Sequence, residues 1–173
     1  MTEDDSTNKI GKTFVWLAWI FAIILLMFAF ESVLEEQYNP NSQPQVSLNS
    51  SGLAEVILKQ NRQGHYLSKG TINEAPVTFL LDTGATQVSI PASVADRLQL
   101  DSYGSYLVQT ANGTVTVYRT KIDQLSIGNI FLYNVAAHIN PAMKSEEILL
   151  GMSALKKVEF SQKGKQLTLR EYP

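Results

Sequence analysis

The chain of 173 residues has no cysteine, only two histidines and no run of basic residues. The lack of cysteine excludes disulfides, thiolate nucleophiles and thiolate metal ligands. Because unrelated sequence separates His65 from His138, a histidine-rich metal site is not expected, and no metal or other cofactor is predicted. A formal net charge of −2 without a Lys/Arg cluster argues against a nucleic-acid partner. Any hydrolytic chemistry would therefore depend on carboxylates.

A long uncharged stretch runs from Thr13 to Phe30 near the N-terminus. An α-helix of this length rises about 27 Å, enough to cross the hydrocarbon core of a bilayer. Lys9 and Lys12 precede the stretch, whereas acidic residues follow it. The positive-inside rule therefore predicts a single-pass inner-membrane protein. Residues 1–12 would form a cytoplasmic tail, residues 13–30 the transmembrane helix, and everything after it would lie on the periplasmic side.

A cleaved signal peptide is the alternative for the same stretch. The apolar core is longer than that of a usual signal peptide, and the sequence Phe30-Glu31-Ser32-Val33-Leu34 is a poor cleavage site, so an uncleaved anchor is favoured. Residues 31–52 are rich in Asn, Ser, Gln and Pro and are predicted to form a flexible linker. One folded domain is then expected over residues 53–173, which is long enough for a single core.

The domain shows many short strand patterns separated by turn signals and little helix. The sequence Asn112-Gly113 is a strong hairpin signal between two strands. Short helices are predicted after Pro91 and over residues 152–157. The predicted strands cover residues 54–60, 65–72, 77–81, 106–109, 114–120, 121–127, 130–139, 148–150, 158–161 and 166–170. This spacing indicates an all-β fold, either a small barrel or a sandwich.

The most informative stretch is an apolar strand that leads directly into Asp82, Thr83, Gly84 and Ala85. Gly84 permits a sharp reversal of the backbone and a close approach by another group. Asp82 is then set at the mouth of an apolar interior, where a carboxyl group resists ionisation unless it shares a proton or accepts hydrogen bonds. On these residues alone, an ordinary Asp-Gly turn between two strands is the alternative.

Four features in sequence order make the chain resemble one protomer of the retropepsin-like aspartic proteases, and in particular their bacterial, membrane-anchored branch. They are the Asp-Thr-Gly triplet after an apolar strand, a glycine-containing hairpin, a distant apolar-apolar-glycine sequence and a closing hairpin. The resemblance implies a closed β-barrel protomer with one or two short helices. It assigns Asp82 as catalytic, Thr83, Gly84 and Ala85 to the active-site loop, Ala111, Asn112 and Gly113 to the flap, and Leu149, Leu150 and Gly151 to structural support beneath that loop.

The same resemblance implies a homodimer. Family members hold one water between two aspartates that share a proton. This chain has one Asp-Thr-Gly, and Asp96, Asp101 and Asp123 lack the Thr-Gly context. The second carboxylate is therefore expected from a second copy, with Thr83 hydrogen-bonded across the two-fold axis. Met152 follows the second glycine where retroviral enzymes have arginine, which is a departure from the retroviral dimer contact.

The predicted function is hydrolysis of a peptide or protein substrate by a membrane-anchored aspartic endopeptidase. The alternative is a non-catalytic peptide-binding or scaffold module with the same fold. The intact triplet argues against it, because binding alone does not require a carboxylate at Asp82. Phosphoryl chemistry is excluded, since the sequence has no phosphate-binding glycine-rich loop. His65 and His138 are predicted to be packing or surface residues.

Overall fold

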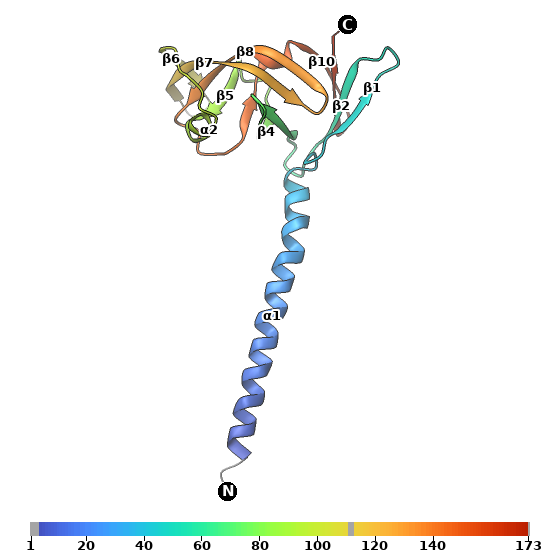
Figure 1. Ribbon diagram of the computed structural model, residues 1–173, viewed down its shortest axis with the longest axis vertical. Coiled ribbons are helices and arrows are strands. Elements are labelled where there is room, and N and C mark those ends of the chain that lie inside the picture. The colour runs from blue at the N-terminus through green and yellow to red at the C-terminus, as the bar shows by residue number, and fades with distance from the viewer. Residues whose placement is uncertain (1–3, 111–112, 173) are drawn as a thin grey trace. The chain divides into compact units, whose positions relative to one another are not determined.

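The computed structural model describes residues 4–110 and 113–172 and forms two units, Met1–Tyr38 and Asn39–Pro173. The first unit is one helix, α1 (Asp4–Tyr38), drawn in blue in Figure 1. Its segment Phe14–Tyr38 contains an 18-residue window with a mean hydropathy of 2.4. The helix therefore has the length and composition of a membrane span, and an N-terminal signal sequence meets the same criteria.

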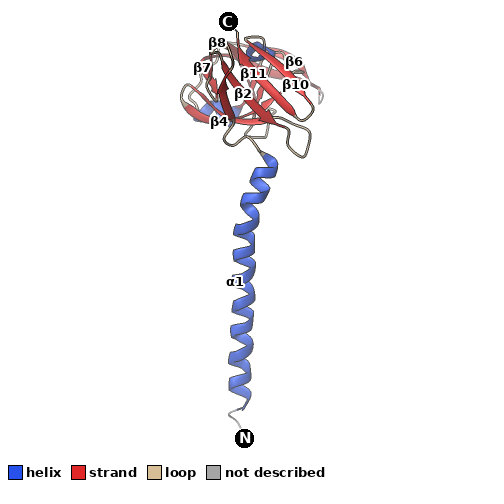
Figure 2. Ribbon diagram, turned by 90° about the vertical axis from the view of Figure 1, so that its right-hand side faces the viewer, coloured by secondary structure: helices blue, strands red, loops and turns tan. Residues whose placement is uncertain are grey.

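The second unit is built mainly of strands, as Figure 2 shows. Its strands are β1 (Gln45–Leu48), β2 (Ala54–Lys59), β3 (Leu67–Ile72), β4 (Ala75–Leu81), β5 (Val88–Pro91), β6 (Ser105–Thr110), β7 (Gly113–Ile127), β8 (Ile130–Asn140), β9 (Ile148–Leu150), β10 (Val158–Lys163) and β11 (Gln166–Glu171), and its helices are α2 (Ala92–Arg97) and α3 (Met152–Leu155). The predicted helix after Pro91 is confirmed as α2.

Most of the strands form a barrel that closes on itself. The seven-stranded sheet has the order β3-β4-β9-β5-β8-β7-β6, and an additional pairing of β3 with β7 joins its two sides. The closure is possible because β7 is 15 residues long. Its first part pairs with β6, its later part pairs with β8, and Leu125 and Ser126 also pair with β3. The predicted closed β-barrel is confirmed, and the sandwich alternative is wrong.

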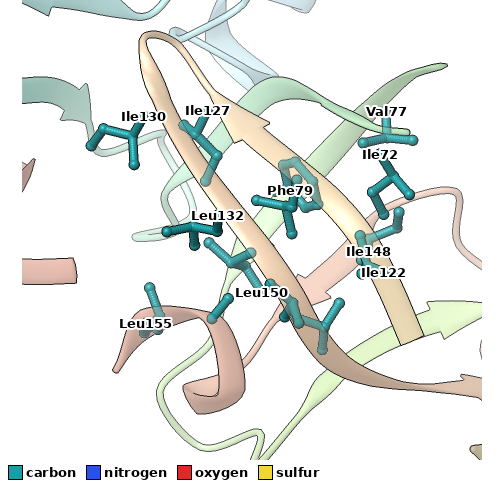
Figure 3. Packing of buried hydrophobic residues seen from close by; sticks show 14 of the residues in the cluster. Ile72, Val77, Phe79, Ile122, Ile127, Ile130, Leu132, Ile148, Leu150 and Leu155 are labelled. Carbon is teal, nitrogen blue, oxygen red and sulfur yellow. The ribbon is translucent and has the colours of Figure 1, made fainter. Parts of the chain in front are cut away.

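Alternating apolar residues fill the inside of this barrel (Figure 3). On β4, Val77 and Phe79 are buried, as the two-residue period of a strand requires. The largest fully buried side chains are Phe79, Leu58, Leu67, Ile72, Ile90, Ile122, Leu125, Ile148, Leu150, Leu155, Leu169 and Val56. The core therefore takes residues from strands that are far apart in the sequence, and it fixes the position where β4 ends.

Residues 31–52 differ from the predicted flexible linker. The residues up to Tyr38 continue α1, and β1 pairs antiparallel with β2 at the edge of a four-stranded sheet of order β1-β2-β11-β10. Val46 and Leu48 on β1 are 53% and 67% exposed, so this strand adds little to the apolar core. The segment is rich in polar residues, as in a flexible linker, but the backbone of β1 forms hydrogen bonds with β2 and is therefore part of the sheet.

A buried asparagine joins the start of the second unit to the barrel. Asn41 is 2% exposed, and its amide nitrogen donates to the backbone oxygens of Lys59 (2.9 Å) and Leu67 (2.7 Å). Its amide oxygen accepts a hydrogen bond from the backbone N–H of Lys59 (2.7 Å). These long-range hydrogen bonds place the chain between α1 and β1 within the folded domain.

Replacing Asn41 with alanine tests whether this segment belongs to the domain. Asn41→Ala would leave three backbone groups without their partner, one of them buried and two part-buried, which is expected to lower the free energy of unfolding by about 1–3 kcal/mol. Chemical unfolding of the full chain in detergent micelles measures this. Asn49→Ala is the matched control, because the Asn49 side chain accepts only local hydrogen bonds, from Ser51 and Leu53. Equal effects of the two substitutions would contradict the structural role of Asn41.

The stability of the domain should also depend on pH through His138. This residue on β8 is 7% exposed, and its burial lowers the pKa of the imidazole below the ordinary value of 6.5. Below pH 6.5 the imidazole of His138 therefore binds a proton more readily in the unfolded chain than in the folded chain. The contribution of His138 to the free energy of unfolding is fully present above pH 6.5 and is lost as the pH drops toward the folded-state pKa.

The expected result is a lower melting temperature at about pH 5 than at about pH 7.5, by more in the native chain than in a His138→Gln variant. Thermal unfolding of both full chains in the same micelles measures the difference. A pH dependence that is the same in both chains would show that other groups cause it.

Candidate active site

Asp82 is held at the point where β4 leaves the barrel. β4 pairs in parallel with β9, with Leu81 opposite Leu150. The backbone N–H of Asp82 donates to the carbonyl of Leu150 (3.2 Å), so the pairing extends to the aspartate itself. Asp82 is half-buried. The apolar strand predicted from the sequence therefore ends as expected, with a carboxylate at the end of the core.

The residues after Asp82 form a tight turn that holds the carboxylate. The N–H of Gly84 donates to Asp82 Oδ1 (2.8 Å), and the N–H of Ala85 donates to the Asp82 carbonyl (3.3 Å). Thr83 and Gly84 are exposed, and Ala85 is half-buried. The carboxylate is thus oriented by its own loop, and the outer side of this loop is open to a further molecule.

Gly151 lies directly against this loop, as the sequence predicts for the apolar-apolar-glycine segment. A Cβ atom on Gly151 would lie 2.7 Å from the carbonyl oxygen of Ala85 and would overlap the carbonyl oxygen of Gln87. The N–H of Met152 donates to the Ala85 carbonyl (2.8 Å). Leu150 is 1% exposed and belongs to the core. Only glycine fits here, and this segment connects the loop to the core.

Ser153 fixes the far end of the loop, although no motif in the sequence marks it. Its hydroxyl accepts from the N–H of Val88 (3.0 Å) and donates to the carbonyl of Ala136 (2.7 Å). Serine at the start of a short helix is so common that composition and spacing give no signal for this role. The hydroxyl links the loop to β8 and to α3 at once.

The hairpin of β6 and β7 is the predicted flap. Gly113 opens β7 and pairs with Thr110 in the antiparallel register, whereas Ala111 and Asn112 lie outside the described residues. Val108 lies opposite Val115, so one face of the hairpin is apolar near its tip. At the base of the hairpin, the Tyr106 hydroxyl donates to Gln87 Oε1 (3.3 Å). The hairpin therefore contacts the segment that follows the loop of Asp82.

Asp96, Asp101 and Asp123, the other aspartates of the second unit, lie at the surface. Asp96 and Asp101 are exposed, and Asp123 forms an ion pair with Lys121 (3.9 Å) with its side chain 81% exposed. Within residues 4–110 and 113–172, no three His, Asp or Glu side chains cluster as a metal site would require. Among the described aspartates of this unit, only Asp82 is held by its own loop, and one carboxylate can act as a base or as an acid but not as both in the same step.

Comparison with known proteins agrees with this geometry. The protein family described as gag-polyprotein putative aspartyl protease matches residues 68–157, just over half of the chain. That range contains the triplet of Asp82, the β6–β7 hairpin and Gly151.

Two curated proteins and one solved structure are similar over large parts of the chain. An uncharacterized protein in the cobV 5′ region of Sinorhizobium is 27% identical over 96% of this chain and 77% of its own length. The uncharacterized protein RP867 of Rickettsia prowazekii is 26% identical over 90% of this chain and 68% of its own length. The crystal structure of a retropepsin-like aspartic protease from Rickettsia conorii has a TM-score of 0.56 and 26% identity, and it covers 66% of this chain and 98% of that one.

The resemblance predicted from the sequence is confirmed by the family match and by the shared fold. The structured loop of Asp82 and the glycine beneath it lie in the matched region. The chain therefore belongs to the gag-polyprotein aspartyl protease family, whose fold is that of the retropepsin-like aspartic proteases.

Proposed function

We propose that the protein is a membrane-anchored aspartic endopeptidase that acts as a homodimer, with one Asp82 from each protomer. The observation that carries this proposal is the loop of Asp82, which is oriented by Gly84 and packed on Gly151 in a chain of this protease family. A loop with so little freedom supports a role that needs a fixed carboxylate.

The chemistry follows from two carboxylates that share one proton. The ionised Asp82 removes a proton from a water held between the two carboxylates, and the oxygen of that water attacks the scissile carbonyl carbon. The protonated Asp82 of the other protomer donates to the carbonyl oxygen, giving a neutral tetrahedral intermediate. When the C–N bond breaks, the Asp82 that took the proton from the water gives it to the leaving nitrogen, and a hydroxyl group of the intermediate returns a proton to the pair of carboxylates as the carboxylic acid product forms.

The dimer would use the open side of the loop. Thr83 and Gly84 are exposed at the position where a second loop would approach, and Gly84 has no Cβ to prevent the contact. Thr83 would hydrogen-bond to the partner loop across the two-fold axis. The β6–β7 hairpin would close over a bound peptide as the flap, with Val108 and Val115 as its apolar face.

The proposed location follows from α1 and the charges at its two ends. Lys9 and Lys12 lie before the apolar segment, and Glu31, Glu35 and Glu36 lie after it. The positive-inside rule then places the N-terminus in the cytoplasm and the protease domain in the periplasm. Two anchored chains would also meet at a higher effective concentration than two free chains.

Mixing active and inactive chains tests the catalytic residue and the dimer together. Asp82→Asn alone is expected to abolish cleavage of a peptide library by the full chain in liposomes. If each active site needs two Asp82 carboxylates, equal amounts of native and Asp82→Asn chains, mixed before reconstitution, should give about one quarter of the activity of the same total amount of native chain, because only native pairs are active. A monomeric enzyme would give about one half.

Asp96→Asn is the control, because it makes the same chemical change at an exposed carboxylate on α2. It should be fully active alone and in the mixture. Cleavage by the Asp82→Asn chain at the native rate would exclude the aspartic protease mechanism. A complete lack of cleavage by the native chain would favour a peptide-binding module.

Fractionation of a Gram-negative host that expresses the full chain tests the anchor and its orientation. An uncleaved anchor should leave the full-length chain in the membrane fraction after a carbonate wash. Protease added to spheroplasts should digest the domain and spare a short N-terminal fragment. A shorter soluble product would identify the segment as a signal sequence, and a domain protected from added protease would reverse the orientation.

A further inference from the structure

We propose that Tyr106 is a positioning residue, whose hydroxyl group latches the base of the β6–β7 hairpin to Gln87 and His138 and so holds the hairpin over the substrate site. The inference rests on the proposed protease function, because it assumes that a peptide binds beneath this hairpin. It adds a residue outside the Asp-Thr-Gly loop that would set how readily a substrate binds.

Three segments that are distant in the sequence meet at the Tyr106 hydroxyl group. The hydroxyl donates to Gln87 Oε1 at 3.3 Å, and its oxygen lies 3.1 Å from Nδ1 of His138. Gln87 is in the segment that leaves the active-site loop, and His138 is on β8. The tyrosine is therefore connected both to the loop of Asp82 and to the wall of the barrel.

The single proton of the Tyr106 hydroxyl group determines which atom donates in each of its two hydrogen bonds. A tyrosine hydroxyl has one proton, so when it donates to Gln87, its oxygen can accept only from an N–H at Nδ1 of His138. His138 is 7% exposed, and its burial lowers the pKa of the imidazole, which favours the neutral ring. The arrangement thus requires a proton on Nδ1, which the neutral ring supplies as the Nδ1–H tautomer, and it orients the hydroxyl toward the active-site segment.

The tyrosine ring is fixed separately from the hydroxyl. Its edge meets the His138 ring at a centroid distance of 6.1 Å and an interplanar angle of 86°. The guanidinium carbon of Arg119 lies 4.8 Å from the centroid of the Tyr106 ring. Arg119 is opposite His138 in the pairing of β7 with β8. A phenylalanine would keep these ring contacts, so the hydroxyl is not needed to fill the space.

The barrel holds the hairpin at its base, where β7 pairs with β8 from Tyr118 onward and the N–H of Arg119 donates to the carbonyl of Gly104 (3.0 Å). Among the described strands, β6 is the last of its sheet and pairs only with β7, so its outer backbone edge has no neighbouring strand. The closing contact of the barrel, between β3 and β7, lies at the other end of β7, at Leu125 and Ser126. The side chain of Tyr106 therefore gives β6 a contact with the rest of the domain, whereas the backbone pairing with the barrel is made by β7.

The kinetic test replaces Tyr106 with phenylalanine in the full chain in liposomes. Loss of the latch should raise KM for a cleaved peptide by about 2- to 10-fold, the range for one hydrogen bond between neutral groups. It should leave kcat within about 2-fold, since the hydroxyl does not contact the reacting atoms. Tyr118→Phe is the matched control, because Tyr118 is an exposed tyrosine on the same hairpin and should keep the native KM. Equal KM values for the two variants would overturn the proposal.

Hydrogen exchange tests the latch without depending on cleavage. In the full chain in micelles, the amides of residues 105–110 should exchange about 2- to 10-fold faster in Tyr106→Phe than in Tyr118→Phe, because the hairpin opens more often. Equal exchange would exclude the latch even if the protein is a protease. Faster exchange in Tyr106→Phe would support the latch even if the native chain does not cleave peptides.

A double substitution then identifies the partner of the hydroxyl. Gln87→Leu removes the acceptor and should increase the exchange of β6 in the same direction as Tyr106→Phe. If the two residues act through one contact, the double variant should exchange no faster than the faster single variant. If the increase in exchange rate in the double variant equals the product of the two single increases, Gln87 and Tyr106 act separately, which would contradict the latch.

Discussion

The parallel pairing of β4 with β9 is the constraint on which the rest of the site depends. It places the N–H of Asp82 on the carbonyl of Leu150 and brings Gly151 against the backbone of Ala85. Leu150 is part of the close-packed core, so its hydrogen bond with the N–H of Asp82 connects the residue that carries the carboxylate directly to that core. Parallel neighbours need a long connection, and here that connection contains the hairpin and the barrel closure.

Much of this arrangement could be predicted from local sequence. The apolar run into Asp82, the glycine that permits the turn and the hairpin signal at Gly113 each have a short-range physical cause. The apolar run of β4 predicted a strand, whereas the alternation of buried Val77 and Phe79 with less buried neighbours became visible only in the structure. Closure of the barrel was a weaker prediction, since it depends on the length of β7, which the sequence suggested as two separate strands. The backbone continues through Thr120 without a break because β8 pairs with it on both sides of that point.

The features that the sequence did not reveal depend on side chains that meet over long distances. Asn41 joins two strands by hydrogen bonds that no local composition indicates, so residues 31–52 suggested a linker. The contact of Tyr106 with His138 spans 32 residues and is equally hidden. His138 was expected to be a packing or surface residue and is buried, but its role as the partner of a tyrosine needs the fold. Long-range hydrogen bonds made by single polar side chains therefore cannot be predicted from one sequence.

In the proposed dimer, activity would depend on how often two copies of the chain meet, because each copy supplies one Asp82. A soluble protein would control this through its concentration and through the area of its interface. For the proposed anchored enzyme, the density of chains in the membrane takes that role, because both partners move in one plane with their domains on one side. A modest interface would then be sufficient, and the exposed loop at Thr83 would find a partner only where enough copies are present. Hydrolysis would be confined to the membrane surface without any separate inhibitory segment.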